Sequence, residues 1–228
     1  MENITKESRN KNKINNNYIA GLVHADGTFT APLIKGKNKL YINPRFILTQ
    51  HIMNKDIINE IKRLLNDKGH IKYQTNNIMK YTITNIEDII KIILPIFDKY
   101  QVRSNKYYSY LKFKLLVKII YYEKPIYKSS LWLFTIILSR LINPNIKLSK
   151  QIRYLNKEEI KMIENKELPL DIDYKNIINK YCPELNIIIK DNNIPLNIYN
   201  NQIKIKNSQE LNIDFIKGLF DSDGSNLV

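Results

Sequence analysis

The chain has 228 residues, of which 43% are hydrophobic and 25% charged, as in a globular rather than a disordered protein. Lys and Arg number 36 against 22 Asp and Glu, and the net charge of +14 points to a polyanionic partner, with nucleic acid ahead of an anionic membrane surface. One cysteine and three histidines without metal-ligand spacing exclude a disulfide framework and a zinc finger, and no apolar run is long enough to span a bilayer.

Hydrophobic periodicity and turn residues predict the elements in the first part of the chain. An apolar segment ending at Gly27 predicts a short helix, and two alternating segments after it predict strands. Asn54 is expected to be the N-cap of the next helix, and the pair Asn76–Asn77 to be the turn of a hairpin. In chain order we expect a helix at 18–26, strands at 28–37 and 40–50, a helix from 54, strands at 70–75 and 79–84, and helices at 87–100 and 105–122.

Apolar spacing also predicts which side chains face the core. In the second strand, Phe46 and Leu48 fall on one face and Arg45 and Ile47 on the other. The helix from 54 and the helix 87–100 each carry an apolar stripe at helical spacing, formed by Ile57, Ile58, Ile61, Leu64 and Leu65 and by Ile89, Ile90, Ile93 and Phe97. This order of elements predicts one α+β domain.

After residue 125 the pattern becomes less regular. Helices are predicted at 130–142 and 156–165. The rest of the interval is polar and rich in Asn and Pro, which is typical of a linker with short elements.

A short segment occurs twice, once near each end of the chain. The sequence YIAGLVHADGT at 18–28 matches FIKGLFDSDGS at 215–225 in its Ile, Gly, Leu, Asp and second Gly. Gly21 and Ala25 are four residues apart, as are Gly218 and Ser222, and small residues at this spacing allow two helix backbones to approach closely. We therefore expect the two helices to pack against each other.

Each repeated helix ends in an acid, Asp26 or Asp223. A carboxylate is unfavourable at a helix C-terminus, and two of them side by side are more so. A divalent cation between them would make the arrangement favourable, and oxygen ligands suit Mg²⁺ and phosphodiester hydrolysis. A single Asp-Gly pair is usually only a turn, but two copies with matching flanks argue against that interpretation.

At these residues the sequence resembles the LAGLIDADG homing endonucleases and maturases, since IAGLVHADG and IKGLFDSDG match the family's nine-residue signature. The segments FILTQHIMNKD (46–56) and PIFDKYQVRSNKYYSYLKFK (95–114) are also similar to the family. The resemblance implies an αββαββα fold with a saddle-shaped antiparallel sheet that lies on DNA. The signature helices would meet at the interface between two such units.

The resemblance also implies roles for individual residues. Asp26 and Asp223 would bind the metal, and Gln50 and Lys106 would complete the active site, with Lys99 as the second choice for the lysine. The implied reaction is Mg²⁺-dependent cleavage of both strands of a long DNA target. Some members of the family act instead as maturases that bind group I intron RNA.

Double-stranded DNA is the expected partner, and the polar face of the sheet would read base edges in the major groove. Alternation places Arg45, Lys72, Gln74 and Lys80 opposite the apolar set, so these are the candidate DNA contacts. The segment 101–130 holds seven Lys and Arg and could lie along phosphates, although a solvated basic face is the simpler interpretation.

The second signature is followed by only a few residues, so we expect one complete domain and the first helix of another. The expected division is a flexible basic arm at 1–17, a first LAGLIDADG domain at 18–125, a linker at 126–211 and a signature helix of a truncated second domain at 212–228. The resemblance implies a monomer, and the truncation leaves a homodimer open.

Three functions stay open at this point: a DNA endonuclease impaired by truncation, an RNA-binding maturase, or an inactive remnant. The acids of the basic arm, Glu2 and Glu7, argue against a transit peptide. Family habit and A/T-rich codon usage favour a protein encoded in an organelle, with the mitochondrion as the expected location.

Overall fold

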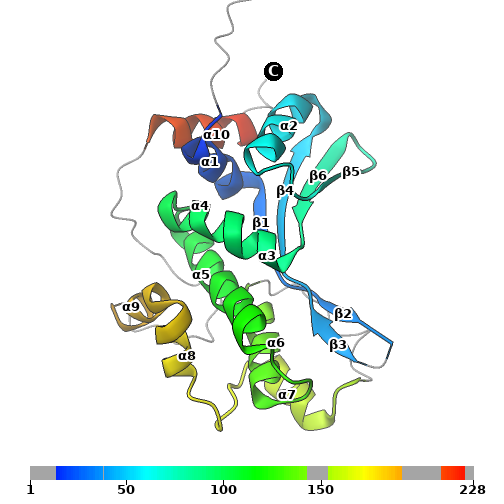
Figure 1. Ribbon diagram of the computed structural model, residues 1–228, viewed down its shortest axis with the longest axis vertical. Helices are drawn as coiled ribbons and strands as arrows, with labels where there is room; N and C mark the ends of the chain where they lie inside the picture. The colour runs from blue at the N-terminus through cyan, green and yellow to red at the C-terminus, as the bar shows by residue number, and fades with distance from the viewer. Residues whose placement is uncertain (1–13, 38, 143–153, 192–211, 224–228) are drawn as a thin grey trace, which may run out of the picture.

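The computed structural model describes residues 14–37, 39–142, 154–191 and 212–223. The predicted basic arm lies mostly outside these residues. The architecture combines helices with an antiparallel sheet, as predicted, and places a helical part beside the sheet domain (Figure 1). The strands are β1 (Gly27–Thr30), β2 (Leu33–Lys35), β3 (Leu40–Ile42), β4 (Arg45–His51), β5 (His70–Tyr73) and β6 (Ile78–Ile83).

In residues 16–123, helices and turns precede, separate and follow the strands along the chain. Turns of wider π geometry interrupt two of them. The elements are α1 (Asn16–Asp26), the 3-10 turn η2 (Ile52–Asn54), α2 (Lys55–Leu64), α3 (Ile86–Asp88), the π turn η3 (Ile89–Ile93), α4 (Leu94–Lys99), α5 (Ser104–Lys118) and the π turn η4 (Ile119–Glu123). The predicted helix 87–100 is thus interrupted just before Pro95, which has no N–H to bond to the carbonyl of Lys91.

Four strands form one antiparallel sheet in the order β1-β4-β6-β5, and β2 pairs with β3 in a separate ribbon. Each of the two long strands predicted at 28–37 and 40–50 is split at a proline, Pro32 or Pro44, because proline donates no hydrogen bond to the ladder. The amide of Asn43 donates to the Pro32 carbonyl at 3.0 Å, so the ribbon continues the direction of the sheet (Figure 1).

One face of the sheet is buried and the other is open. Phe46 and Leu48 are fully buried, whereas Arg45 and Ile47 are partly exposed, as the alternation predicted. The predicted apolar face of α2 is at least partly buried except at Leu64, the last residue of the helix, which is 46% exposed. The hairpin between β5 and β6 is confirmed, with both Asn76 and Asn77 at positive φ.

The segment predicted as a linker contains four described helices. They are α6 (Ser130–Ile142), α7 (Lys157–Asn165), α8 (Tyr174–Tyr181) and α9 (Pro183–Asp191). Ser139 of α6 donates to the Ala31 carbonyl at 2.5 Å, and Lys114 of α5 donates to Glu184 of α9 at 2.9 Å. These helices therefore lie against the sheet domain.

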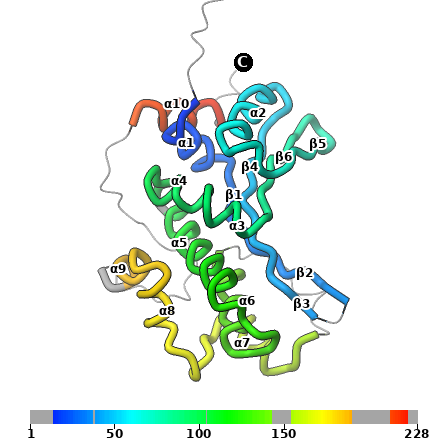
Figure 2. The backbone as a smooth tube through the Cα atoms, viewed as in Figure 1, coloured from blue at the N-terminus to red at the C-terminus, as the bar shows by residue number. Residues whose placement is uncertain are grey.

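The last described helix, α10 (Ile213–Asp223), lies beside α1 although the two are far apart in the sequence. Figures 1 and 2 show α10 in red next to α1 in blue at one end of the molecule. Asn15 donates to Asp214, 199 residues away, at 2.7 Å. The sequence repeat is therefore also a pair of neighbouring helices.

Candidate active site at the junction of the repeated helices

The backbones of α1 and α10 touch at equivalent glycines. A Cβ atom on Gly21 would lie 1.9 Å from the Phe215 carbonyl oxygen, and one on Gly218 would lie 2.0 Å from that of Tyr18. Both distances are far below van der Waals contact, so only glycine fits at either position. Phe215 and Tyr18 occupy the same place in their repeats, which makes the contact reciprocal.

Side chains near the helix ends reinforce this contact. The Tyr18 hydroxyl donates to Asp221 at 2.7 Å, and the Ser222 hydroxyl donates to Asp26. Burial, followed by the bond to the Asp221 carboxylate, raises the pKa of Tyr18 well above its ordinary value, so the phenol remains a donor at every physiological pH. Each helix thus holds an acid of its neighbour. Ala25 lies one turn beyond Gly21 and is partly exposed.

Asp26 lies where α1 ends and β1 begins. The buried Gln50, at the end of β4, donates from Nε2 to Asp26 Oδ2 at 2.5 Å. Ser222 Oγ donates to the same oxygen. Among the described residues no donor reaches Oδ1, and Asp26 is partly exposed, so this second oxygen is available to a cation.

Lys106 explains how an acid is tolerated at the end of α1. Its ammonium donates to three carbonyl oxygens around the helix C-terminus, those of Val23 at 3.0 Å, Ala25 at 3.2 Å and Gly27 at 2.7 Å. A cation there offsets the partial negative charge of the helix end. The alternative lysine, Lys99, lies over the Tyr100 ring instead, with 5.3 Å from Nζ to the centroid.

His24 belongs to the helix interface rather than to a cluster of acids. Its ring lies 5.8 Å from that of Phe215, and its Nδ1 accepts from the Arg103 amide at 3.3 Å. His24 therefore has a packing role where α1 meets α10.

Asp223 is the last described residue of α10 and follows Ser222, which bonds to Asp26. Its side chain lies outside what the structure describes. Across the described residues, no group of three or more His, Cys, Asp or Glu gathers to form a complete metal site. A site with only the two acids Asp26 and Asp223 would still suit Mg²⁺, because this ion is usually bound by one or two carboxylates together with water and substrate phosphates.

Three of the four candidate DNA contacts, Arg45, Lys72 and Lys80, lie on the open face of the sheet. The register pairs Lys72 directly with Lys80, and Thr30 with Arg45. Gln74 follows β5, and its amide donates to the Ile78 carbonyl at 2.7 Å, which keeps it in line with the hairpin. Like charges directly opposite each other destabilise a sheet, and a bound anion would reduce the repulsion between Lys72 and Lys80.

The basic segment 101–130 does not form a solvated face along α5. Lys112 is fully buried, with its ammonium 4.1 Å from the centroid of the Tyr108 ring. Lys114 is 3% exposed and bonds to Asp98 at 2.8 Å as well as to Glu184. These lysines serve the core, so the suggestion that this helix lies along phosphates is wrong for them.

Asn54 belongs to the site, although its position in the sequence predicts a different role. Asn54 was predicted as the N-cap of α2, but its side chain makes no cap bond. It donates instead to Gln50 Oε1 at 2.7 Å and to the Asp221 carbonyl at 3.5 Å. The only available signal was the spacing of four residues between two amide side chains.

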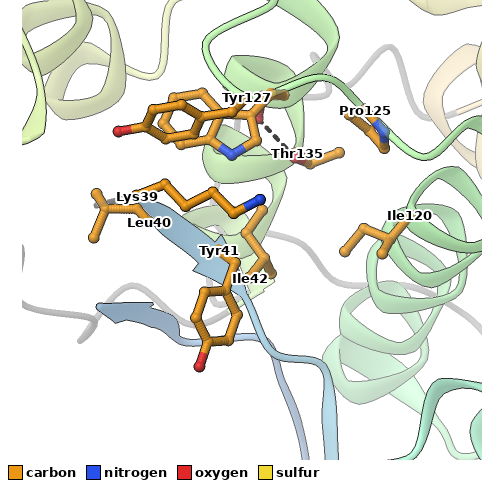
Figure 3. A pocket seen from close by; sticks show the side chains of 9 residues that line it. Lys39, Leu40, Tyr41, Ile42, Ile120, Pro125, Tyr127 and Thr135 are labelled. Atoms are coloured by element: carbon orange, nitrogen blue, oxygen red, sulfur yellow. Dashed lines mark hydrogen bonds between the residues drawn. The ribbon is translucent and has the colours of Figure 1, made fainter. Parts of the chain in front are cut away.

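A cavity of about 150 Å³ lies elsewhere, between β3 and α6 (Figure 3). Its lining is largely apolar and aromatic, and Lys39 is its one ionisable amine. In Figure 1 these elements are at the opposite end of the molecule from α1 and α10. The cavity is therefore separate from the acids of the candidate active site. Within the described ranges, no helix is long and apolar enough to cross a membrane.

Comparisons with known proteins find similar sequences and similar folds. Residues 19–117 match the family described as LAGLIDADG endonuclease. The "Probable intron-encoded DNA endonuclease 1" of Mycosarcoma maydis is 26% identical over 212 residues, which cover 91% of this chain and 66% of that protein. The "Uncharacterized mitochondrial protein RF1" of Saccharomyces cerevisiae is 30% identical over 122 residues, covering 49% of this chain and 25% of that protein.

Among solved structures, the I-SmaMI LAGLIDADG homing endonuclease bound to uncleaved DNA in the presence of calcium ions gives a TM-score of 0.59 at 18% identity. The match covers 91% of this chain and 58% of that one. Residues 19–117 are therefore similar to the LAGLIDADG endonuclease family, and the fold of the chain is similar to that of LAGLIDADG homing endonucleases. The chain spans less than two thirds of the length of each of these relatives.

Proposed function

We propose that the chain acts as a Mg²⁺-dependent homing endonuclease on double-stranded DNA, with Asp26 and Asp223 as the metal ligands. The observation that carries the proposal is the position of Asp26 at the contact of the two repeated helices, with both of its donors on Oδ2. Bound Mg²⁺ would stabilise charge on the phosphate and lower the pKa of a coordinated water.

The other residues of the site have positioning and electrostatic roles in this proposal. Gln50 fixes the Asp26 carboxylate through Oδ2, and its buried position keeps that bond out of competition with water. Lys106 holds the carbonyls on both sides of Asp26 and keeps the helix end fixed. Its ammonium also offsets negative charge when a phosphate approaches.

The open face of the sheet supplies the DNA surface. Arg45, Lys72 and Lys80 share this face, Gln74 follows β5, and a twisted antiparallel ribbon fits the major groove. The names of the relatives, one an intron-encoded DNA endonuclease and one a mitochondrial protein, support a host intron and a mitochondrial location.

Cleavage of a supercoiled plasmid that carries the uninterrupted host gene tests the proposal. We expect linear product in Mg²⁺, none in EDTA, and none with Asp26→Asn. Asp67→Asn is the matched control, because Asp67 is an exposed turn residue at positive φ, where asparagine is equally suited. An intact plasmid with the wild-type chain, or cleavage that survives Asp26→Asn, would reject the proposal.

A further inference from the structure

Asn54 occupies the boundary between η2 and α2 but does not cap the helix. Its backbone has φ −91° and ψ 21°, outside the extended conformation of most N-cap residues, and its side chain makes no bond to α2. Asp56 in the first turn provides the negative charge that the helix start favours. The Asn54 amide is therefore free of the local role that its sequence position suggests.

The same amide joins two distant parts of the site. Asn54 Nδ2 donates to Gln50 Oε1 at 2.7 Å, at the end of β4, and to the Asp221 carbonyl at 3.5 Å, in the last turn of α10. Gln50 in turn donates to Asp26 at 2.5 Å. A continuous chain of donation thus runs from Asn54 through Gln50 to Asp26.

The direction of this chain is fixed at both ends. An ionised carboxylate and a backbone carbonyl can only accept hydrogen bonds, so Asp26 requires the NH₂ group of Gln50 and Asp221 requires the NH₂ group of Asn54. With both amides oriented this way, the Gln50 oxygen meets the Asn54 nitrogen. Without the Asn54 donor, the Gln50 oxygen would have no hydrogen-bond partner among the described residues, and the amide would be held at its nitrogen alone.

We infer that Asn54 is a positioning residue, which orients the Gln50 amide so that its nitrogen faces Asp26. This inference rests on the proposed function and extends it to a residue that touches neither metal nor DNA in the proposal. Residues in direct contact with a metal ligand, as Gln50 is with Asp26, typically contribute about 10- to 100-fold to metal affinity or activity, and Asn54 acts through Gln50.

The variants Asn54→Asp and Asn54→Leu test the inference in the full chain. Both keep the size of the side chain and remove its donor, and we expect cleavage to fall by at least about tenfold in each. Asp is as good an N-cap as Asn, so a purely capping role would leave the Tm of Asn54→Asp equal to that of the wild type or higher. A residue with only a capping role would give no loss of cleavage in this variant.

Two controls isolate the contact with Gln50. Asn59→Asp adds the same charge to α2 at a partly exposed position and should leave cleavage unchanged. In a Gln50→Ala background, Asn54→Asp should cause no further loss, because both changes break the same chain of bonds. Losses that multiply in the double variant, or an equal loss in Asn59→Asp, would overturn the inference.

NMR of the side-chain amide of Gln50 gives a readout that does not depend on cleavage. A Gln50 proton bonded to a carboxylate should be shifted downfield in the wild type. The Gln50 signals should change in Asn54→Asp, which offers the amide a second carboxylate, and in Asn54→Leu, which leaves the amide oxygen without a donor. If the wild type fails to cleave any target, the proposed function fails while this measurement still decides the role of Asn54. Unchanged Gln50 signals in both variants would overturn it.

Discussion

Gly21 and Gly218 lie at the same position of their repeats, and each is covered by the backbone of the other's helix. The contact places Ser222 against Asp26 and Tyr18 against Asp221, so the two helix ends that carry acids are held side by side. Close backbone contact at the glycines is therefore the condition on which the arrangement of the acids depends.

Replacing either glycine by alanine should destabilise the chain. Elsewhere in a helix this change stabilises by up to about 1 kcal/mol, but here the new Cβ would meet a carbonyl oxygen at 1.9 or 2.0 Å. Overpacking of this kind costs about 1–3 kcal/mol, so the Tm of Gly21→Ala and Gly218→Ala should fall by several degrees. Asn17→Ala on α1 serves as the control and should not lower the Tm. An equal or higher Tm for both glycine variants would show that the helices do not touch at these residues.

The repeat could be recognised from sequence because the spacing of small residues on a helix is a local property. The helix of residues 18–26 and the alternation in β4 are confirmed for the same reason. The strand breaks at Pro32 and Pro44 also had a local cause, the missing N–H, which the alternating pattern concealed. Local patterns thus predicted most of the elements of the first domain.

The positions of long polar side chains depend on partners far away in the sequence, and the predicted positions of Lys114 and Asn54 were wrong for this reason. Lys114 meets Glu184, 70 residues later, and so is buried rather than solvated. Asn54 had a sound local role as an N-cap, but Gln50 and the Asp221 carbonyl provide acceptors that no local pattern shows. The roles of Asp26, Asp223 and Lys106 remain predictions, and so does the division into domains.

Lys114 should be needed to hold α9 against α5. Lys114 is 3% exposed, and its ammonium bonds to Asp98 at 2.8 Å and to Glu184 at 2.9 Å. Lys114→Met would remove this cation from both carboxylates. We expect a loss of about 2 kcal/mol in the free energy of unfolding, measured by urea denaturation. Lys180→Met breaks the exposed pair with Glu123 and should change stability far less. Similar losses in the two variants would contradict this role of the buried pair.

The same ion pair predicts part of the acid sensitivity. Burial raises the pKa of Glu184, but the bond to Lys114, a backbone hydrogen bond and the positive charge of Lys114 together hold that pKa below the ordinary 4.5. A lowered carboxyl pKa contributes stability that is present above pH 4.5 and is lost as the pH falls through the folded value. Stability measured from pH 6 to pH 3 should therefore fall less steeply in Lys114→Met than in the wild type. Parallel curves would exclude this contribution.

Lys112 predicts a pH dependence of the same sign in a higher pH range. Burial lowers the pKa of its ammonium from 10.5 to about 7, so between these values the unfolded chain binds more protons than the folded one. The contribution of Lys112 to stability therefore rises with pH across this window, and Lys112→Met should remove that rise. Urea denaturation at pH 7, 8 and 9 measures the slope, with Lys118→Met, on the same helix but partly exposed, as the control. Equal slopes in the wild type and Lys112→Met would contradict the assignment.

The open face of the sheet should bind DNA through charges that do not stabilise the fold. Lys72 and Lys80 are directly opposite each other across β5 and β6, an arrangement that costs stability in the free protein. Lys72→Ala should therefore leave the Tm unchanged or slightly higher while it weakens DNA binding.

Salt titration of binding to host-gene DNA separates the kinds of contact on this face. If both lysines meet phosphates, Lys72→Ala and Lys80→Ala should each reduce the slope of log K against log salt by about 1. Arg45→Ala should instead reduce discrimination between DNA sequences if its guanidinium contacts a guanine. Lys161→Ala, on the exposed surface of α7, should change neither quantity. An unchanged slope in both lysine variants would place the DNA on another surface, because a cation that neutralises a phosphate must release a counterion when the DNA binds.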